Sequence, residues 1–151
     1  MKKFNSIDDI LQFAMNEEQK AVDFYTVLAK NAQNEDMRRV FEDFAQEEVS
    51  HKARLARIRE EGSYPMPGEV VKDLKIADYQ TRVEPRADMP YDEALVVAMN
   101  KEKAAFKLYS ALAEKAPNEE MKKLFLSLAE EESRHKLRFE LEYDENVLRE
   151  N

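Results

Sequence analysis

Apolar side chains recur at steps of three and four residues through four long segments of this chain, which is the spacing of one helix face. We therefore predict α-helices at about residues 6–32, 34–61, 90–116 and 118–146. Asn34 and Asn118 are good N-caps, each is followed by two acidic residues, and Pro117 ends the helix before it. The pattern predicts two antiparallel helical hairpins, 6–61 and 90–146, joined by a crossover at 62–89.

The two hairpins are copies of each other. Aligning residues 14–54 with residues 98–138 gives 19 identities in 41 positions, where unrelated helical segments would give roughly 4. The crossover of 28 residues can span roughly 90 Å, whereas a 26-residue helix is about 39 Å long. It is long enough to cross a bundle, so we predict an all-α, antiparallel four-helix bundle with a long crossover between helices 2 and 3.

The composition agrees with that fold and excludes several classes of partner and of metal site. Of 151 residues, 37% are charged and 43% hydrophobic, with two glycines and five prolines, and the length suits a single domain, 1–151. The net charge of -8 argues against nucleic acid and anionic membranes as partners. The absence of cysteine excludes thiolate metal sites and fits a reducing compartment, so we expect a cytoplasmic protein.

Each predicted helix has one apolar face, made by the residues at steps of three and four, which we call its seam. Six ionisable side chains interrupt these otherwise apolar seams. The spacing Glu-x-x-His occurs twice and contains the only two histidines of the chain. Residues three apart share a helix face, so each pair can direct a carboxylate and an imidazole to one metal ion. The first and third helices each carry a further glutamate, Glu18 and Glu102. Each lies as many residues before its turn as the glutamate of the Glu-x-x-His pair lies after it. If the hairpins pack as a bundle, the six groups converge in its middle: Glu18, Glu48, His51, Glu102, Glu132 and His135.

The chemistry of this set favours two metal ions. Carboxylates buried without partners cost several kcal/mol each, so a metal-free bundle should carry leucine or alanine at these positions. A structural polar network is the alternative, but it must satisfy every one of its six members. Two divalent ions balance the four carboxylates, and oxygen-rich ligands with one imidazole per ion suit iron or manganese, of which iron is our first choice. The ligand pattern is that of ferritin-like two-metal bundles.

The runs EEQKAVDFYTVLA and AQEEVSHK, repeated as KEKAAFKLYSALA and AEEESRHK, resemble the ferritin-like domain of rubrerythrins over residues 7–143. The resemblance implies that Glu18 and His51 hold one iron, that Glu102 and His135 hold the other, and that Glu48 and Glu132 bridge them. Tyr25 and Tyr109 resemble residues that hydrogen-bond the terminal glutamates, with core packing as their alternative interpretation.

The chain also departs from the family pattern. It lacks the four cysteines of a rubredoxin domain, so we expect a separate electron-donor protein. Ala105 replaces an extra glutamate that many rubrerythrins carry, which puts their peroxide-linked ligand shift in doubt. Val49 replaces the haem methionine of the similar bacterioferritins, so we expect no haem.

The resemblance implies a non-haem di-iron oxidoreductase that reduces hydrogen peroxide or dioxygen, and we expect it to be a homodimer. Two other functions stay open. One is a ferroxidase for iron storage or transfer, for which iron is the substrate. The other, of a different class, is a structural metal-binding bundle that acts through protein interactions.

Overall fold

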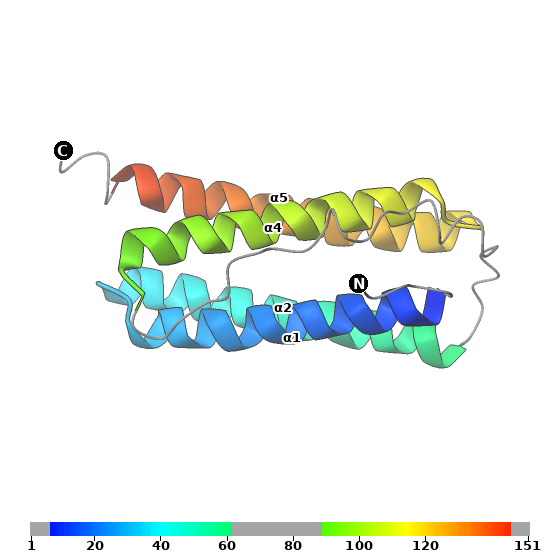
Figure 1. Ribbon diagram of the computed structural model, residues 1–151, viewed down its shortest axis with the longest axis horizontal. Helices are drawn as coiled ribbons and strands as arrows, with labels where there is room; N and C mark the ends of the chain where they lie inside the picture. Colours follow the sequence, from blue (N-terminus) through cyan, green and yellow to red (C-terminus); the bar gives the residue numbers. More distant parts are fainter. Residues whose placement is uncertain (1–6, 62–88, 146–151) are drawn as a thin grey trace. The chain divides into compact units, whose positions relative to one another are not determined.

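Four α-helices make up the secondary structure of the computed structural model, which describes residues 7–61 and 89–145 (Figure 1). They are α1 (Ile7–Lys30), α2 (Glu35–Glu61), α4 (Tyr91–Glu114) and α5 (Glu119–Tyr143). Within these ranges there is no strand, which confirms the all-α class and the four helices of the predicted bundle. Most of the predicted crossover lies outside the described residues.

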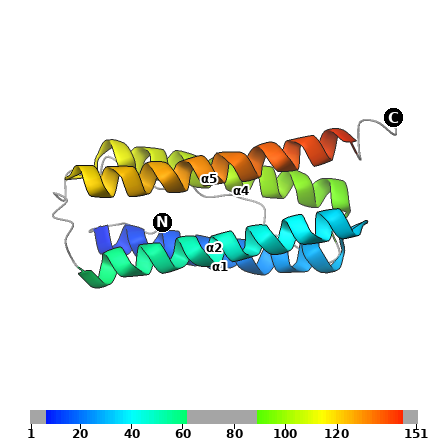
Figure 2. The same ribbon diagram turned by 180° about the vertical axis from the view of Figure 1, so that it is seen from behind.

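The described helices form two compact units, each an antiparallel hairpin. One unit pairs α1 with α2, drawn from blue to green in Figure 1, and the other pairs α4 with α5, drawn from green to red. Figure 2 shows the same two pairs from behind. The assignment of residues 1–151 to a single domain stays a prediction.

Asparagine caps start the second helix of each hairpin, as the sequence predicts. The backbone N–H of Met37 donates to Oδ1 of Asn34, and that of Met121 donates to Oδ1 of Asn118, both at 2.9 Å. Each cap satisfies a backbone donor that the first helical turn leaves without an intrahelical acceptor, and contributes about 1 kcal/mol. The two hairpins therefore turn at repeat-equivalent residues.

The first helix of each hairpin ends two residues before its predicted end. The N–H of Ala32 donates to the carbonyl of Ala29 at 3.4 Å, and the N–H of Ala116 donates to that of Ala113 at 3.3 Å. These bonds span three residues instead of four, so the last turn tightens and the α-helices stop at Lys30 and Glu114. The first helices of the two hairpins therefore end through the same backbone hydrogen-bond pattern.

The predicted apolar seams are the buried faces of the helices. Phe44, Ala32, Ala105 and Ala116 are only half-buried, but the other apolar seam positions are buried. The buried seam residues are Leu11, Ala14, Ala21, Tyr25, Leu28, Met37, Phe41, Leu55, Ile58, Leu95, Ala98, Tyr109, Leu112, Met121, Phe125, Leu128 and Phe139.

No helix in the described part of the chain combines the length and the apolar character that crossing a bilayer requires.

Candidate metal centre

The first hairpin gathers three of the six predicted ligands. Glu18 projects from α1, and Glu48 and His51 project from one turn of α2. Each exposes at most 2% of its surface, and one ligand atom from each lies within 4.8 Å of the others. Nδ1 of His51 is 3.5 Å from Oε2 of Glu18 and 3.6 Å from Oε1 of Glu48. We call these three residues the first triad.

A hydrogen bond fixes α1 and α2 relative to each other at the height of this triad. Lys52 follows His51 in the chain and Gln19 follows Glu18, and Nζ of Lys52 donates to Oε1 of Gln19 at 2.9 Å. The bond lies at the partly buried edge of the hairpin, so it joins the two helices beside the ligands without entering their face. It therefore helps to set the register that brings Glu18 level with His51.

The second hairpin repeats the arrangement, as its sequence predicts. Glu102 projects from α4, and Glu132 and His135 project from one turn of α5. Each exposes at most 2% of its surface, and their ligand atoms also lie within 4.8 Å of one another. Nδ1 of His135 is 3.5 Å from Oε1 of Glu102. These three residues form the second triad.

The separations between the ligand atoms fit a metal ion shared within a triad. Donor atoms bound at about 2.1 Å to one first-row ion, at a tetrahedral angle, lie roughly 3.4 Å apart. The observed nitrogen–oxygen distances of 3.5 to 3.6 Å are close to that value. They exceed the distance of about 2.9 Å that is usual for N–H···O hydrogen bonds. Each triad is thus suited in donor type, burial and spacing to hold a cation.

Tyr25 and Tyr109 are buried one repeat apart, on α1 and α4. Each lies seven residues, about two turns, after the glutamate of its own helix, so the tyrosine and the glutamate share a face. The ring of Tyr25 packs edge-on against Phe44 of α2, with ring centroids 6.4 Å apart. The predicted hydrogen bonds from the two tyrosines to the terminal glutamates stay a prediction.

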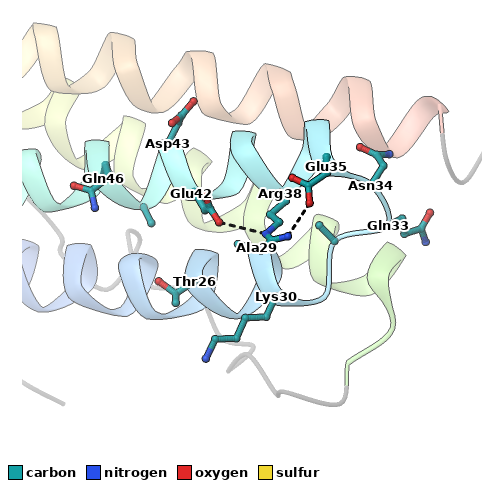
Figure 3. Close-up of a pocket in the computed structure, with 12 residues that line it drawn as sticks. Thr26, Ala29, Lys30, Gln33, Asn34, Glu35, Arg38, Glu42, Asp43 and Gln46 are labelled. Carbon is teal, nitrogen blue, oxygen red and sulfur yellow. Dashed lines mark hydrogen bonds and ion pairs between the residues drawn. The ribbon is translucent and has the colours of Figure 1, made fainter.

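A wide groove lies beside the turn of the first hairpin (Figure 3). It has a volume of about 1020 Å³ and is lined by residues between Thr26 and Gln46, none of which is a predicted ligand. Arg38 lies there between Glu35, at 2.7 Å, and Glu42, at 3.5 Å. Because none of the residues that line the groove belongs to the first triad, the groove adds nothing to the metal chemistry.

One buried ionisable residue was missed by the sequence analysis. Glu142 of α5 exposes 2% of its surface and accepts a hydrogen bond of 3.0 Å from the hydroxyl of Tyr91. It lies seven residues after His135, about 10 Å further along the same face of the helix. The repeat offered a signal, because the equivalent residue of the first hairpin is Ile58.

The structure thus describes an all-α protein with two buried triads of two glutamates and one histidine, each of which could hold a metal ion. The sequence model of one protein family, described as Rubrerythrin, matches residues 9–86 and 93–150. The chain belongs to the rubrerythrin family, as its resemblance predicts. Comparisons with curated proteins and with solved structures gave no significant match.

Proposed function

We propose that the two triads together bind two iron ions in one ferritin-like bundle, and that the protein uses them to reduce hydrogen peroxide or dioxygen. The observation that carries this proposal is the repetition, in both hairpins, of a buried triad with ligand atoms less than 4.8 Å apart. Membership of the rubrerythrin family supports iron as the metal. Manganese is the alternative with the same ligand preferences.

In this proposal the glutamates have two roles. Glu18 with His51, and Glu102 with His135, are terminal ligands of one ion each. Glu48 and Glu132 bridge the two ions. Four carboxylates then neutralise two divalent cations, which removes most of the cost of burying the charges. The ligand set uses all six groups that the buried seams place at this height.

The burial of the ligands and their number on each ion suit a small oxidant. The six ligands expose at most 2% of their surface, so bulk water has little access to them. Ligation by three carboxylates or fewer and one imidazole leaves room on each ion for a small molecule. When bound, two ferrous ions supply one electron each, which is the number required to cleave the oxygen–oxygen bond of peroxide.

In this proposal a separate donor protein supplies the electrons that restore the ferrous state. The 151 residues contain no cysteine, so they hold no thiolate-bound iron that could relay electrons to the site. The proposed partners are therefore peroxide or dioxygen and a separate electron-donor protein. Homodimer formation and a cytoplasmic location are further proposals.

Replacing Tyr25 or Tyr109 with phenylalanine is expected to weaken iron binding about 10- to 100-fold, because each hydroxyl is proposed to orient a terminal glutamate. Competition with a chromophoric chelator measures the affinity. Tyr143→Phe, at a half-buried position outside the triads, is the matched control and should bind iron as the unmodified protein does. Unchanged affinity in both buried variants would show that these tyrosines only fill the core.

The function itself is tested by the oxidant preference of the anaerobically prepared ferrous protein. In stopped-flow mixing we expect much faster oxidation by hydrogen peroxide than by dioxygen, with two electrons delivered per chain. Faster oxidation by dioxygen would favour the ferroxidase or an oxidase. Solution scattering provides a second discriminator, because iron storage requires a cage and a small dimer argues against it.

A further inference from the structure

Three positions beside the proposed metal ligands carry different side chains in the two hairpins. In the first hairpin they are Gln19, Asp23 and Lys52, and hydrogen bonds join them. Nζ of Lys52 donates to Oε1 of Gln19 at 2.9 Å, and Nε2 of Gln19 donates to Oδ1 of Asp23 at 3.0 Å. These bonds link α2 to α1, and the group has no net charge, because one ammonium balances one carboxylate.

The equivalent positions of the second hairpin are all lysines. At the repeat offset of 84 residues they are Lys103, Lys107 and Lys136. Lys103 and Lys107 are exposed, whereas Lys136 is half-buried. We call these three residues the lysine cluster. It gathers three positive charges where the first hairpin has no net charge, in a chain whose own net charge is -8.

The lysine cluster cannot repeat the hydrogen bonds of the first hairpin. An ammonium group has three donors and no acceptor, so Lys103 cannot accept the bond that Gln19 accepts in the first hairpin. Nζ of Lys136 donates instead to Oε1 of Glu140, on its own helix, at 2.6 Å. Among the described residues, neither Lys103 nor Lys107 has an ion-pair partner. Their positive charges are therefore available to a partner molecule.

The lysine cluster lies at the height of the second triad. Lys103 directly follows Glu102 in α4, and Lys136 directly follows His135 in α5. Successive side chains of a helix point about 100° apart, so the lysines flank the ligands without sharing their buried face. A molecule bound to the lysine cluster would therefore be held beside the second triad.

An exposed aromatic ring accompanies the lysines. Phe106 exposes 40% of its surface and lies three residues after Lys103, which is one turn along the same side of α4. Its repeat equivalent is Val22, which is smaller and half-buried. Protein interfaces combine an apolar centre, often aromatic, with a polar rim. Phe106 beside the lysine cluster has this composition.

The sign of the charge indicates the kind of partner. Complementary charges steer two proteins together and fix their orientation, whereas like charges keep wrong partners apart. In a chain with an excess of carboxylates, a local group of lysines directs an acidic protein to one surface. Electron-transfer complexes are transient and bury small interfaces, below about 1,200 Å². Three lysines and one exposed ring suit an encounter of that kind.

We propose that the lysine cluster and Phe106 form the docking site of an acidic electron-donor protein, which delivers its electrons beside the second triad. This inference rests on the proposed function, because that function requires a donor. The donor loses one electron in each encounter, and two encounters replace the two electrons that one peroxide molecule takes up. The two protons needed to turn peroxide into two water molecules come from solvent.

Full-length variants with altered charge test the docking site. Lys103→Gln with Lys107→Asp gives the second hairpin the residues of the first, where the same side chains are accommodated. Lys122→Gln with Lys123→Asp is the matched control, because it makes the same change of charge at exposed positions near the turn. Lys107→Gln is a milder variant that carries the test if the double variant does not fold. Phe106→Val tests the ring.

Docking is measured by calorimetry on the metal-free protein, so that the result does not depend on iron. The probe is a flavodoxin of net negative charge. At low ionic strength we expect the double variant to bind it at least about five-fold more weakly than the parent protein, and Lys107→Gln and Phe106→Val at least about two-fold more weakly. The control should bind as the parent protein does. At about 1 M salt the effect of the lysine substitutions should disappear, because salt screens the charges.

Electron delivery is the second readout. The iron-loaded ferric protein is mixed anaerobically with reduced flavodoxin, and the rate is divided by that with dithionite, a small reductant that needs no docking site. We expect this ratio to fall in the double variant and to stay constant in the control. A cytochrome c of net positive charge and a short DNA duplex test other partners, and both should bind more weakly than flavodoxin.

Several results would overturn the docking site. They are failure of the parent protein to bind flavodoxin, unchanged affinity in the folded lysine variants or in Phe106→Val, and tighter binding of the DNA duplex than of flavodoxin. Failure of the proposed function is distinct from these results. It would appear as a parent protein that binds no iron, or whose ferrous form does not react with peroxide, whatever the metal-free protein binds.

Discussion

Alanine in place of Glu48 is expected to weaken the binding of both metal ions by at least about 100-fold, whereas alanine in place of His51 is expected to weaken mainly one. Loss of a residue that only orients a ligand costs about 10- to 100-fold in affinity, so a lost ligand should cost at least the upper figure. Glu48 is proposed to bridge the ions, and His51 to bind one of them. The repeat predicts the same contrast for Glu132→Ala and His135→Ala.

Anaerobic titration of each variant with ferrous iron, in competition with a chromophoric chelator, measures both affinities. Glu130→Ala is the control, because Glu130 is exposed and lies two residues before the proposed ligand Glu132. Circular dichroism should show unchanged helix content in every variant, since the seams on either side of the triads are apolar. Equal binding by Glu48→Ala and the parent protein would refute the ligand assignment, and loss of one ion only would refute its bridging role.

Removal of the metal is expected to lower the thermal unfolding midpoint by roughly 10–20 °C. A ligand present at 100 times its dissociation constant stabilises the folded state by about 2.7 kcal/mol. Two such ions contribute about 5 kcal/mol, and each kcal/mol shifts the midpoint of a domain of this size by about 2–4 °C. The comparison is made by calorimetry of the iron-loaded protein before and after anaerobic treatment with EDTA.

The buried carboxylates predict a further effect in the metal-free protein. Glu48→Gln removes one buried charge at nearly constant volume, so the metal-free variant should be at least as stable as the metal-free parent. Added iron should also raise the thermal unfolding midpoint of this variant less than that of the parent protein. If neither iron nor EDTA changes the thermal unfolding midpoint of the parent protein, the triads are a structural polar network.

Much of this organisation was readable in the sequence because it depends on local rules and on repetition. The caps at Asn34 and Asn118 fixed the turns, and the three-and-four spacing identified the buried faces on which Glu48 and His51 lie. An apolar seam that is interrupted at the same height in both copies is an unusual pattern, so the ligand positions stood out. The family match over most of the chain confirmed the resemblance.

Features that depend on three-dimensional detail were not predicted. The tightened last turns at Ala32 and Ala116 depend on backbone hydrogen bonds that residue types alone do not specify. Glu142 stands in a run rich in charged residues after Glu140, where one buried carboxylate looks like its exposed neighbours. Its burial in the structure and its contact with Tyr91, 51 residues earlier, reveal that this carboxylate belongs to the interior.

We propose that the two triads form one site for two metal ions. Its most direct test is the iron content of the protein after anaerobic reconstitution with ferrous iron and removal of loosely bound metal. We predict two iron ions per chain. Fewer than about one iron or manganese ion per chain, from a fully helical protein, would show that the triads are not a two-metal site.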